Sequence, residues 1–190
     1  MAAPIDPATV MLSSNISVAD YRKLERKKDK GAIANFLKQR FTERYLAPVL
    51  DVDTDKKSGF TMMAVACLMI EALESFRQGW LDTRRRSQNA FCSFFAHWPE
   101  FDVFRPHAKD FYKHVRCGIL HQAETKAWLI RRKGDLWDGN YKIINATKFL
   151  KQLRIVLDSY CDQLASEPWE SDVWRCCRAK MDSVCKNVVG

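Results

Sequence analysis

One stretch of the sequence, Phe60–Leu73 (FTMMAVACLMIEAL), is apolar on nearly every side when it is wound as a helix. Such a helix is buried, either in a protein core or in a membrane. About fourteen residues are too few for a membrane span, which needs about 20. We therefore expect a central core helix over Phe60–Leu81. Its second half has a polar side that emerges from the core, with Glu71, Glu74, Arg77 and Gln78.

Further helices are predicted on both sides of this segment, because apolar residues recur there three and four positions apart. Ser17 and Asp20 have the spacing of a capping box, which would open a helix that ends near Lys28. Residues 1–16 are expected to be irregular. The other predicted helices are Ala32–Leu46, ended by Pro48; Ala90–Trp98; His107–Gln122, opened by Pro106; Thr147–Leu164; and Ser171–Lys186.

The hydrophobic period changes after Gln122. Ala127–Arg132 and Tyr141–Asn145 are predicted to be two short strands, and the Asp-Gly pair between them suits a turn. The expected fold is therefore all-α, a helical bundle with a small β-hairpin inserted after the helix His107–Gln122. A chain of 190 residues fits a single domain over 1–190.

Seven cysteines are present, but none form a CxxC pair or a Cys/His cluster with the spacing of zinc ligands. We expect reduced thiols packed as small hydrophobic groups, with no disulfide scaffold, no metal site and no cofactor. The N-terminus lacks the basic start and apolar stretch of a secretory signal. A cytoplasmic location without membrane insertion is the expectation.

The formal net charge of +8 suits a polyanionic partner such as nucleic acid, or equally a soluble protein with a basic surface. Basic clusters occur at Arg22–Lys30, Arg84–Arg86 and Arg131–Lys133. Each of these taken alone is more often a solvated face than a phosphate site, so the net charge by itself does not decide between the two interpretations.

The segment FYKHVRCGILHQ, residues 111–122, contains the candidate catalytic pair Arg116 and His121. Histidine titrates near neutral pH and can act as a general base or acid. Arginine stays charged and offers a planar set of donors suited to phosphate oxygens. The pair fits cleavage of RNA by its own 2′-hydroxyl, with His121 transferring protons and Arg116 stabilising charge on the pentavalent phosphorus.

The spacing of this pair poses a geometric problem. Five residues on an ideal α-helix rotate a side chain by about 140°, so the two would not share a face. Gly118 lies between them and could permit a local irregularity. Alternatively, the helix frays before His121, or a two-fold dimer brings both copies of the pair into one cleft. The sequence leaves these three solutions open.

The same residues resemble the HEPN superfamily of helical domains, whose hallmark is Arg, then four to six residues, then His. Arg116-Cys-Gly-Ile-Leu-His121 matches at the shortest spacing. The longer run FYKHVRCGILHQAETKAWLIRRKG is similar to one bacterial HEPN-like group, as are MAVACLMIEALESFRQGW upstream and INATKFLKQLRIVLDSYCDQL downstream. The resemblance covers about Phe60–Leu164.

This resemblance implies a metal-independent endoribonuclease that works as a homodimer and leaves a cyclic phosphate and a free 5′-hydroxyl. It implies a role in a toxin–antitoxin module, phage defence or RNA processing, and, for a toxin, a neutralising partner protein. Arg116 and His121 carry over as the catalytic residues. Cys117 stands where many active members have Asn, Asp or His.

Four further residues are candidates around this pair. Glu71 is expected either as a carboxylate that holds Arg116 or as a residue at the solvent boundary of its helix. Lys113, His114 and Gln122 could line the substrate cleft. The alternative function is a non-catalytic module of the same fold that binds RNA, a nucleotide or a protein partner, an interpretation that Cys117 favours.

Overall fold

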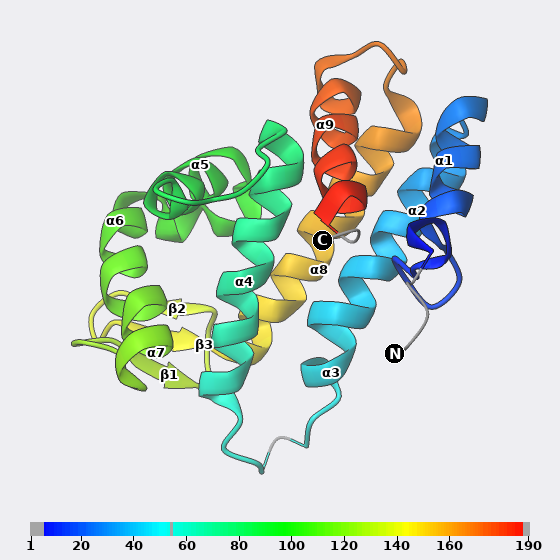
Figure 1. Ribbon diagram of the computed structural model, residues 1–190. Helices are drawn as coiled ribbons and strands as arrows, with labels where there is room; N and C mark the ends of the chain where they lie inside the picture. Colours follow the sequence, from blue (N-terminus) through cyan, green and yellow to red (C-terminus); the bar gives the residue numbers. More distant parts are fainter. Residues whose placement is uncertain (1–5, 54, 188–190) are drawn as a thin grey trace.

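The computed structural model describes residues 6–53 and 55–187, and most of them are helical, as the sequence predicts (Figure 1). The α-helices are α1 (Val18–Lys27), α2 (Lys30–Phe41), α3 (Ala47–Leu50), α4 (Gly59–Gln78), α5 (Ser87–His97), α6 (Ala108–Asp110), α7 (Cys117–Gln122), α8 (Ala146–Ser166) and α9 (Asp172–Asn187). Pro7–Thr9 and Pro99–His107 are 3₁₀-helical, and Thr42–Leu46 and Phe111–Arg116 are π-helical.

Helix α4 lies at the centre of the molecule, as expected for a segment that is apolar on most sides. In Figure 1, α5, α6, α7 and a small sheet lie on one side of it, and α2, α8 and α9 lie on the other. Among the described residues, α4 is the one helix long and apolar enough to cross a membrane, but 61% of that window is buried inside the protein. This burial is typical of a core helix.

Nearly all of the buried hydrophobic residues form one cluster, which extends from Leu12 near the N-terminus to Cys185 in α9. The capping box at Ser17 and Asp20 is present and opens α1. Residues 6–16 contain the short 3₁₀ turn and an isolated bridge from Met11 to Ser17. The first five residues of the predicted irregular N-terminus lie outside the described part of the chain.

The prediction that Pro48 ends a helix is wrong, because the chain continues through it into α3. The π-helical segment Thr42–Leu46 precedes the proline, and the N–H of Ala47 donates to the carbonyl of Thr42, five residues back. Proline has no N–H, so a shift in the hydrogen-bonding pattern accommodates it. Pro106 likewise lies inside the 3₁₀ segment that leads into α6, one residue before the helix start that we predicted.

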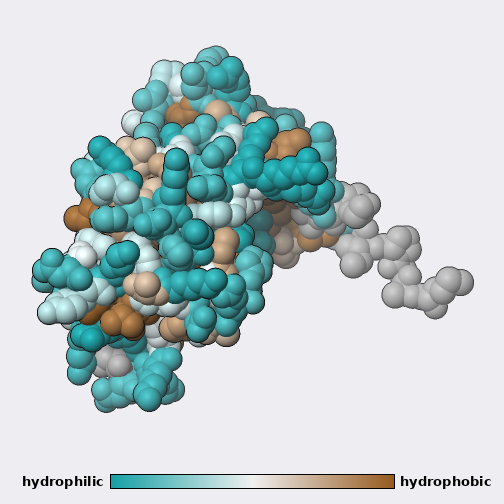
Figure 2. Space-filling model, turned by 90° about the vertical axis from the view of Figure 1, so that its left-hand side faces the viewer, coloured by the Kyte–Doolittle hydropathy of each residue, from teal (hydrophilic) through white to brown (hydrophobic). Residues whose placement is uncertain are grey.

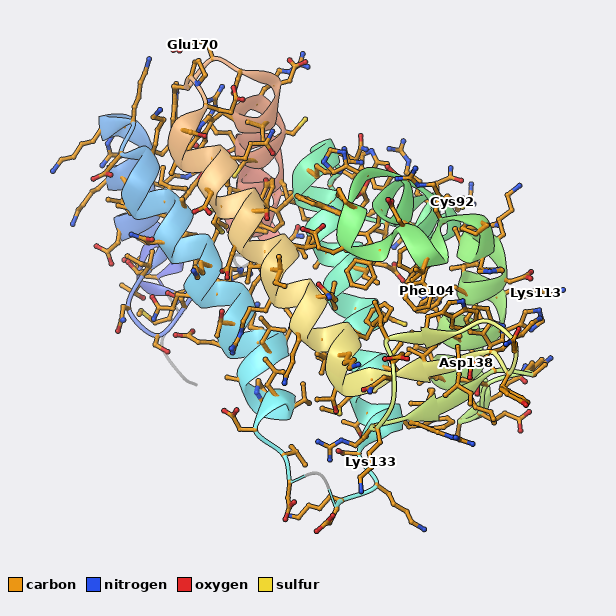
Figure 3. The ribbon with its side chains drawn as sticks, turned by 180° about the vertical axis from the view of Figure 1, so that it is seen from behind. Cys92, Phe104, Lys113, Lys133, Asp138 and Glu170 are labelled. Atoms are coloured by element: carbon orange, nitrogen blue, oxygen red, sulfur yellow. The ribbon has the colours of Figure 1, made fainter. Side chains whose placement is uncertain are left out.

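An aromatic cluster fixes the segment that carries Arg116 and His121 against the core. The ring of Phe111 lies 5.0 Å from that of Phe95 in α5, 5.6 Å from Phe149 in α8 and 6.0 Å from Trp128, measured between centroids. Phe104, labelled in Figure 3, lies between the same elements. The start of the motif helix is therefore held by side chains from three separate elements.

Two short strands occur where we predicted them, but they do not form the expected hairpin. Strand β1 (Leu129–Arg131) pairs in parallel with β3 (Ile143–Asn145), and β2 (Trp137–Asp138) pairs with β3 on its other edge in antiparallel fashion. The strand order is β1-β3-β2. The residues between β1 and β3 contribute a strand of their own, and this places β3 in the middle of the sheet.

Candidate active site

The candidate site is built on a helical segment that runs from Ala108 to Gln122 and widens into π-helix over Phe111–Arg116. At the end of the widened segment, the N–H of Cys117 donates to the carbonyl of Tyr112, five residues earlier. The carbonyl oxygen of His114 accepts a hydrogen bond from the backbone N–H of Lys126 (3.3 Å), beyond the end of the helix. The loop after α7 therefore folds back onto the motif helix.

Gly118 makes this return of the loop possible. It is buried, and a Cβ atom built on it would lie 2.3 Å from the carbonyl oxygen of Glu124. The N–H of Glu124 donates to the carbonyl of Gly118 (3.4 Å). Glycine is required at position 118 because the backbone of Glu124 packs closely against it, and not because the helix is irregular at that residue.

Arg116 is held by Glu71 from the central helix α4. Its Nε donates to Oε1 of Glu71 at 2.8 Å, and the two side chains are 17% and 10% exposed. The guanidinium carbon lies 5.7 Å from the centre of the Tyr112 ring. Burial lowers the pKa of Arg116, but the Glu71 carboxylate and, to a smaller extent, Cys117 together more than offset this, so the pKa lies above its usual value. Arg116 is therefore a fixed positive charge at any physiological pH.

The nitrogen atoms of the predicted pair approach each other within a single chain. Nη1 of Arg116 lies 3.5 Å from Nε2 of His121. Helix α7 continues to Gln122, so fraying before His121 does not explain the contact. The arginine side chain is long enough to reach His121 five residues later, and it directs Nε to Glu71 and Nη1 to His121. Forming this pair does not require a second copy of the chain.

Glu71 is a buried hydrogen-bonding centre rather than a residue at the solvent boundary. Its second oxygen, Oε2, accepts hydrogen bonds from the hydroxyls of Thr83 and Ser87, both at 2.9 Å. Sequence reasoning missed Thr83 and Ser87. The one signal they give is that two hydroxyl residues flank the basic turn Arg84–Arg86, and nothing in that pattern points to Glu71.

The remaining predicted residues surround the pair less closely. Lys113 is exposed at the outer edge of the molecule (Figure 3), and Gln122 is exposed at the end of α7. His114 is half-buried, and its Nδ1 has no hydrogen-bond partner within residues 6–53 and 55–187. Cys117 is half-buried. The pKa of Tyr112 is raised, first by the burial of the Tyr112 side chain and then by its interaction with Cys117.

The site reaches solvent through His121, which is exposed, while the Arg116 side chain beside it is 17% exposed. The face of the molecule that carries α5, α6 and α7 is largely hydrophilic (Figure 2). Within the described residues, no group of three or more His, Cys, Asp and Glu is placed to hold a metal ion. The residues that are present, a fixed cation beside an exposed imidazole, can bind a phosphate group and transfer protons next to it.

Comparison with known proteins finds no relative of this chain. No family model matches the chain, and neither the curated proteins nor the solved structures searched contain a match.

Proposed function

We propose that this chain is a HEPN-type, metal-independent endoribonuclease with Arg116 and His121 as its catalytic residues. The observation that carries the proposal is the 3.5 Å approach of Arg116 Nη1 to His121 Nε2, which holds a cation and a proton-transfer group at one exposed position. The resemblance of RCGILH and its flanking segments to HEPN domains supports the same assignment.

In the proposed reaction, the 2′-hydroxyl of one nucleotide attacks the adjacent phosphorus as a base removes its proton. A bond forms between the 2′-oxygen and phosphorus, the bond to the 5′-oxygen breaks, and the leaving oxygen takes up a proton. His121 serves these proton transfers. Arg116 stabilises the additional negative charge on the pentavalent phosphorus. The products are a cyclic phosphate and a free 5′-hydroxyl.

The position of Arg116 supports this role. Glu71 binds Nε of the guanidinium and Nη1 faces His121, while Nη2 forms no hydrogen bond with any other described residue. A guanidinium fixed in advance loses little freedom when it binds a phosphate, and charge stabilisation of this kind is strongest when the donors are already oriented.

A non-catalytic module that binds RNA, a nucleotide or a protein partner is the second candidate, and Cys117 favours it. The residue after Arg116 offers only a half-buried thiol, where many active HEPN domains have a polar side chain. In this alternative, Arg116 and Glu71 form a structural ion pair and His121 contacts the ligand without transferring protons.

The partners follow from the proposal. RNA would be the substrate, a homodimer the working form, and a neutralising protein would be expected for a toxin. These expectations, and a cytoplasmic location with a role in a toxin–antitoxin module, phage defence or RNA processing, rest on the HEPN resemblance.

The test is cleavage of an end-labelled, structured RNA by the purified protein in EDTA, beside Arg116→Ala and His121→Ala. We expect the wild-type protein to cleave and to leave cyclic phosphate ends, and each substitution to reduce the rate at least 100-fold, within the range for a lost general acid–base or charge-stabilising group. Arg154→Ala and His97→Ala are matched controls on other elements and should cleave normally.

Equal inactivity of the wild type and all variants on several RNAs would contradict the enzyme proposal. RNA binding that depends on Arg116 without any cleavage would instead support the binding module. Toxicity on overexpression that His121→Ala relieves would support the enzyme in the cell.

A further inference from the structure

Three consecutive arginines, Arg84–Arg86, form an exposed turn in the loop between α4 and α5 (Figure 1). None of the three forms an ion pair with any residue in the described ranges. The guanidinium of Arg86 lies over the ring of Trp80, 5.5 Å from its centre. Beside the turn is a hollow of about 490 Å³ lined by Leu81, Asp82 and the three arginines.

In each of the other two basic clusters of the sequence, some residues are used within the fold. In the first, Arg22 pairs with Glu25 and Asp182, and Lys28 pairs with Glu170. In the third, Arg132 donates to the carbonyl oxygens of Val52, Asp53 and Lys56 and so fixes the loop before α4. That third cluster packs at the start of α4, near Gly59. Twelve residues of helix, about 18 Å, separate Gly59 from Glu71, so the third cluster lies far along α4 from the carboxylate that holds Arg116.

The arginine turn is attached directly to the candidate active site. Thr83 and Ser87, the residues on either side of it, both donate to Oε2 of Glu71, while Oε1 of the same carboxylate holds Arg116. The N–H of Arg86 closes the turn by donating to the carbonyl of Thr83 (2.8 Å). One carboxylate therefore sets the position of the turn relative to Arg116 and His121.

The backbone of the turn is strained at Arg85, which has φ of +61°. This left-handed conformation is unfavourable for a residue with a side chain, and glycine adopts it freely. A local cost of this kind points to a use for the side chain at that position. The three adjacent cations also repel one another and outnumber Asp82, the one acidic residue that lines the hollow, so an anionic ligand would relieve this repulsion.

We propose that the Arg84–Arg86 turn binds the backbone phosphates of the RNA strand next to the phosphate that is cleaved. This inference rests on the proposed function and extends the active site from one phosphate to a short stretch of strand. Arginine suits phosphate oxygens because its fork of donors matches them. Leu81 is the one apolar residue that lines the hollow, so the lining suits a charged strand better than the apolar core of a protein interface.

The test measures binding of single-stranded RNA by the triple variant Arg84→Gln/Arg85→Gln/Arg86→Gln, in a His121→Ala background so that RNA is not cleaved. We expect Kd at about 0.1 M salt to rise at least tenfold. The slope of log Kd against log salt should fall by about 2, since each phosphate contact on a single strand contributes about 0.7. The double variant Arg84→Gln/Arg86→Gln keeps Arg85 and should lose about 1.4 of the slope.

The matched control is Arg26→Gln/Lys27→Gln/Arg154→Gln, which removes three exposed charges from α1 and α8. It should change Kd less than threefold, and thermal melting should show that all variants are folded. With His121 intact, the triple arginine variant should raise KM at least tenfold and leave kcat within threefold of wild type.

The outcomes separate this inference from the proposed ribonuclease activity. If the turn variant binds RNA like the control, the inference is overturned, while cleavage that needs Arg116 and His121 would leave the proposed function standing. If binding depends on the turn but the wild type cleaves no RNA, the turn is supported and the nuclease is overturned. No RNA binding by the wild type overturns both, and binding of polyglutamate in place of RNA would overturn the choice of ligand.

Discussion

At the scale of single residues, Glu71 connects more of the candidate site than any other side chain described above. Its two oxygens accept hydrogen bonds from Arg116, Thr83 and Ser87, which belong to two different segments of the chain. All three donors need an acceptor, and an ionised carboxylate has acceptor positions for each of them. The residue therefore positions Arg116, and in the proposed reaction it would act through Arg116 alone.

Replacing Glu71 by Gln keeps the size of the side chain and removes its charge. The amide nitrogen of glutamine can only donate, so at least one of the three donors loses its acceptor. We expect the free energy of unfolding, measured by urea denaturation, to fall by about 1–3 kcal/mol. RNA cleavage should fall at least tenfold, mainly through kcat, because Arg116 loses its fixed position.

The matched control is Glu170→Gln, which removes an exposed carboxylate paired with Lys28. Exposed pairs of this kind contribute little, so stability and cleavage should stay close to wild type. Cleavage by Glu71→Gln at the wild-type rate would contradict the positioning role.

At the scale of secondary structure, the helical segment Pro99–Gln122 contains 3₁₀, α and π turns in succession. The carbonyl of His114, within the π turns, accepts a hydrogen bond from Lys126 in the returning loop. Gly118 allows that loop to approach. The site thus depends on a non-ideal helix, and π turns are frequent at functional sites.

Substituting Ala for Gly118 tests the packing of this loop. The added Cβ would lie 2.3 Å from a backbone oxygen of Glu124, so the loop must shift. We expect a loss of about 1–3 kcal/mol in the free energy of unfolding, the usual cost of overpacking, and a loss of cleavage because His121 is displaced.

Gly31→Ala in α2 is the matched control, since a Cβ at that position meets nothing within 4 Å. It should leave stability unchanged or raise it by up to about 1 kcal/mol, because alanine is the better helix former. If both glycine variants were equally stable, the close approach at Gly118 would be refuted.

At the scale of the whole molecule, the seven free cysteines report on the packing of the helices. Burial raises the pKa of Cys161 and of Cys177 to about 12, and it raises the pKa of Cys67 and Cys185 above the usual value. The thiolate is the reactive form, so these four thiols are protected in the folded protein. The other three are half-buried: Cys92, which Figure 3 labels on α5, Cys117 and Cys176.

A chromogenic disulfide reagent at pH 8 should therefore react quickly with at most three thiols in the native protein. The remaining four should react only when guanidinium unfolds the chain, since raised pKa values keep them protonated at this pH. Cys117→Ser should remove one of the fast-reacting groups. Fast reaction of more than three thiols in the folded wild type would contradict the arrangement of α4, α8 and α9.

The sequence by itself determined where most of the helices lie, because their signals are local. Apolar spacing located α4, α5, α8 and α9 to within a few residues, and Ser17 with Asp20 marked the start of α1. The resemblance also selected Arg116 and His121, whose contact is present. The role of this pair in catalysis stays a prediction.

Only the tertiary structure decided the features that join distant parts of the chain. The predicted hairpin became a parallel pair because residues between the two strands form β2 beside β3. The partners of Glu71 lie 12, 16 and 45 residues away in sequence. Such hydrogen bonds depend on how α4, α5 and the motif helix pack in space, and no local pattern of residues encodes that packing.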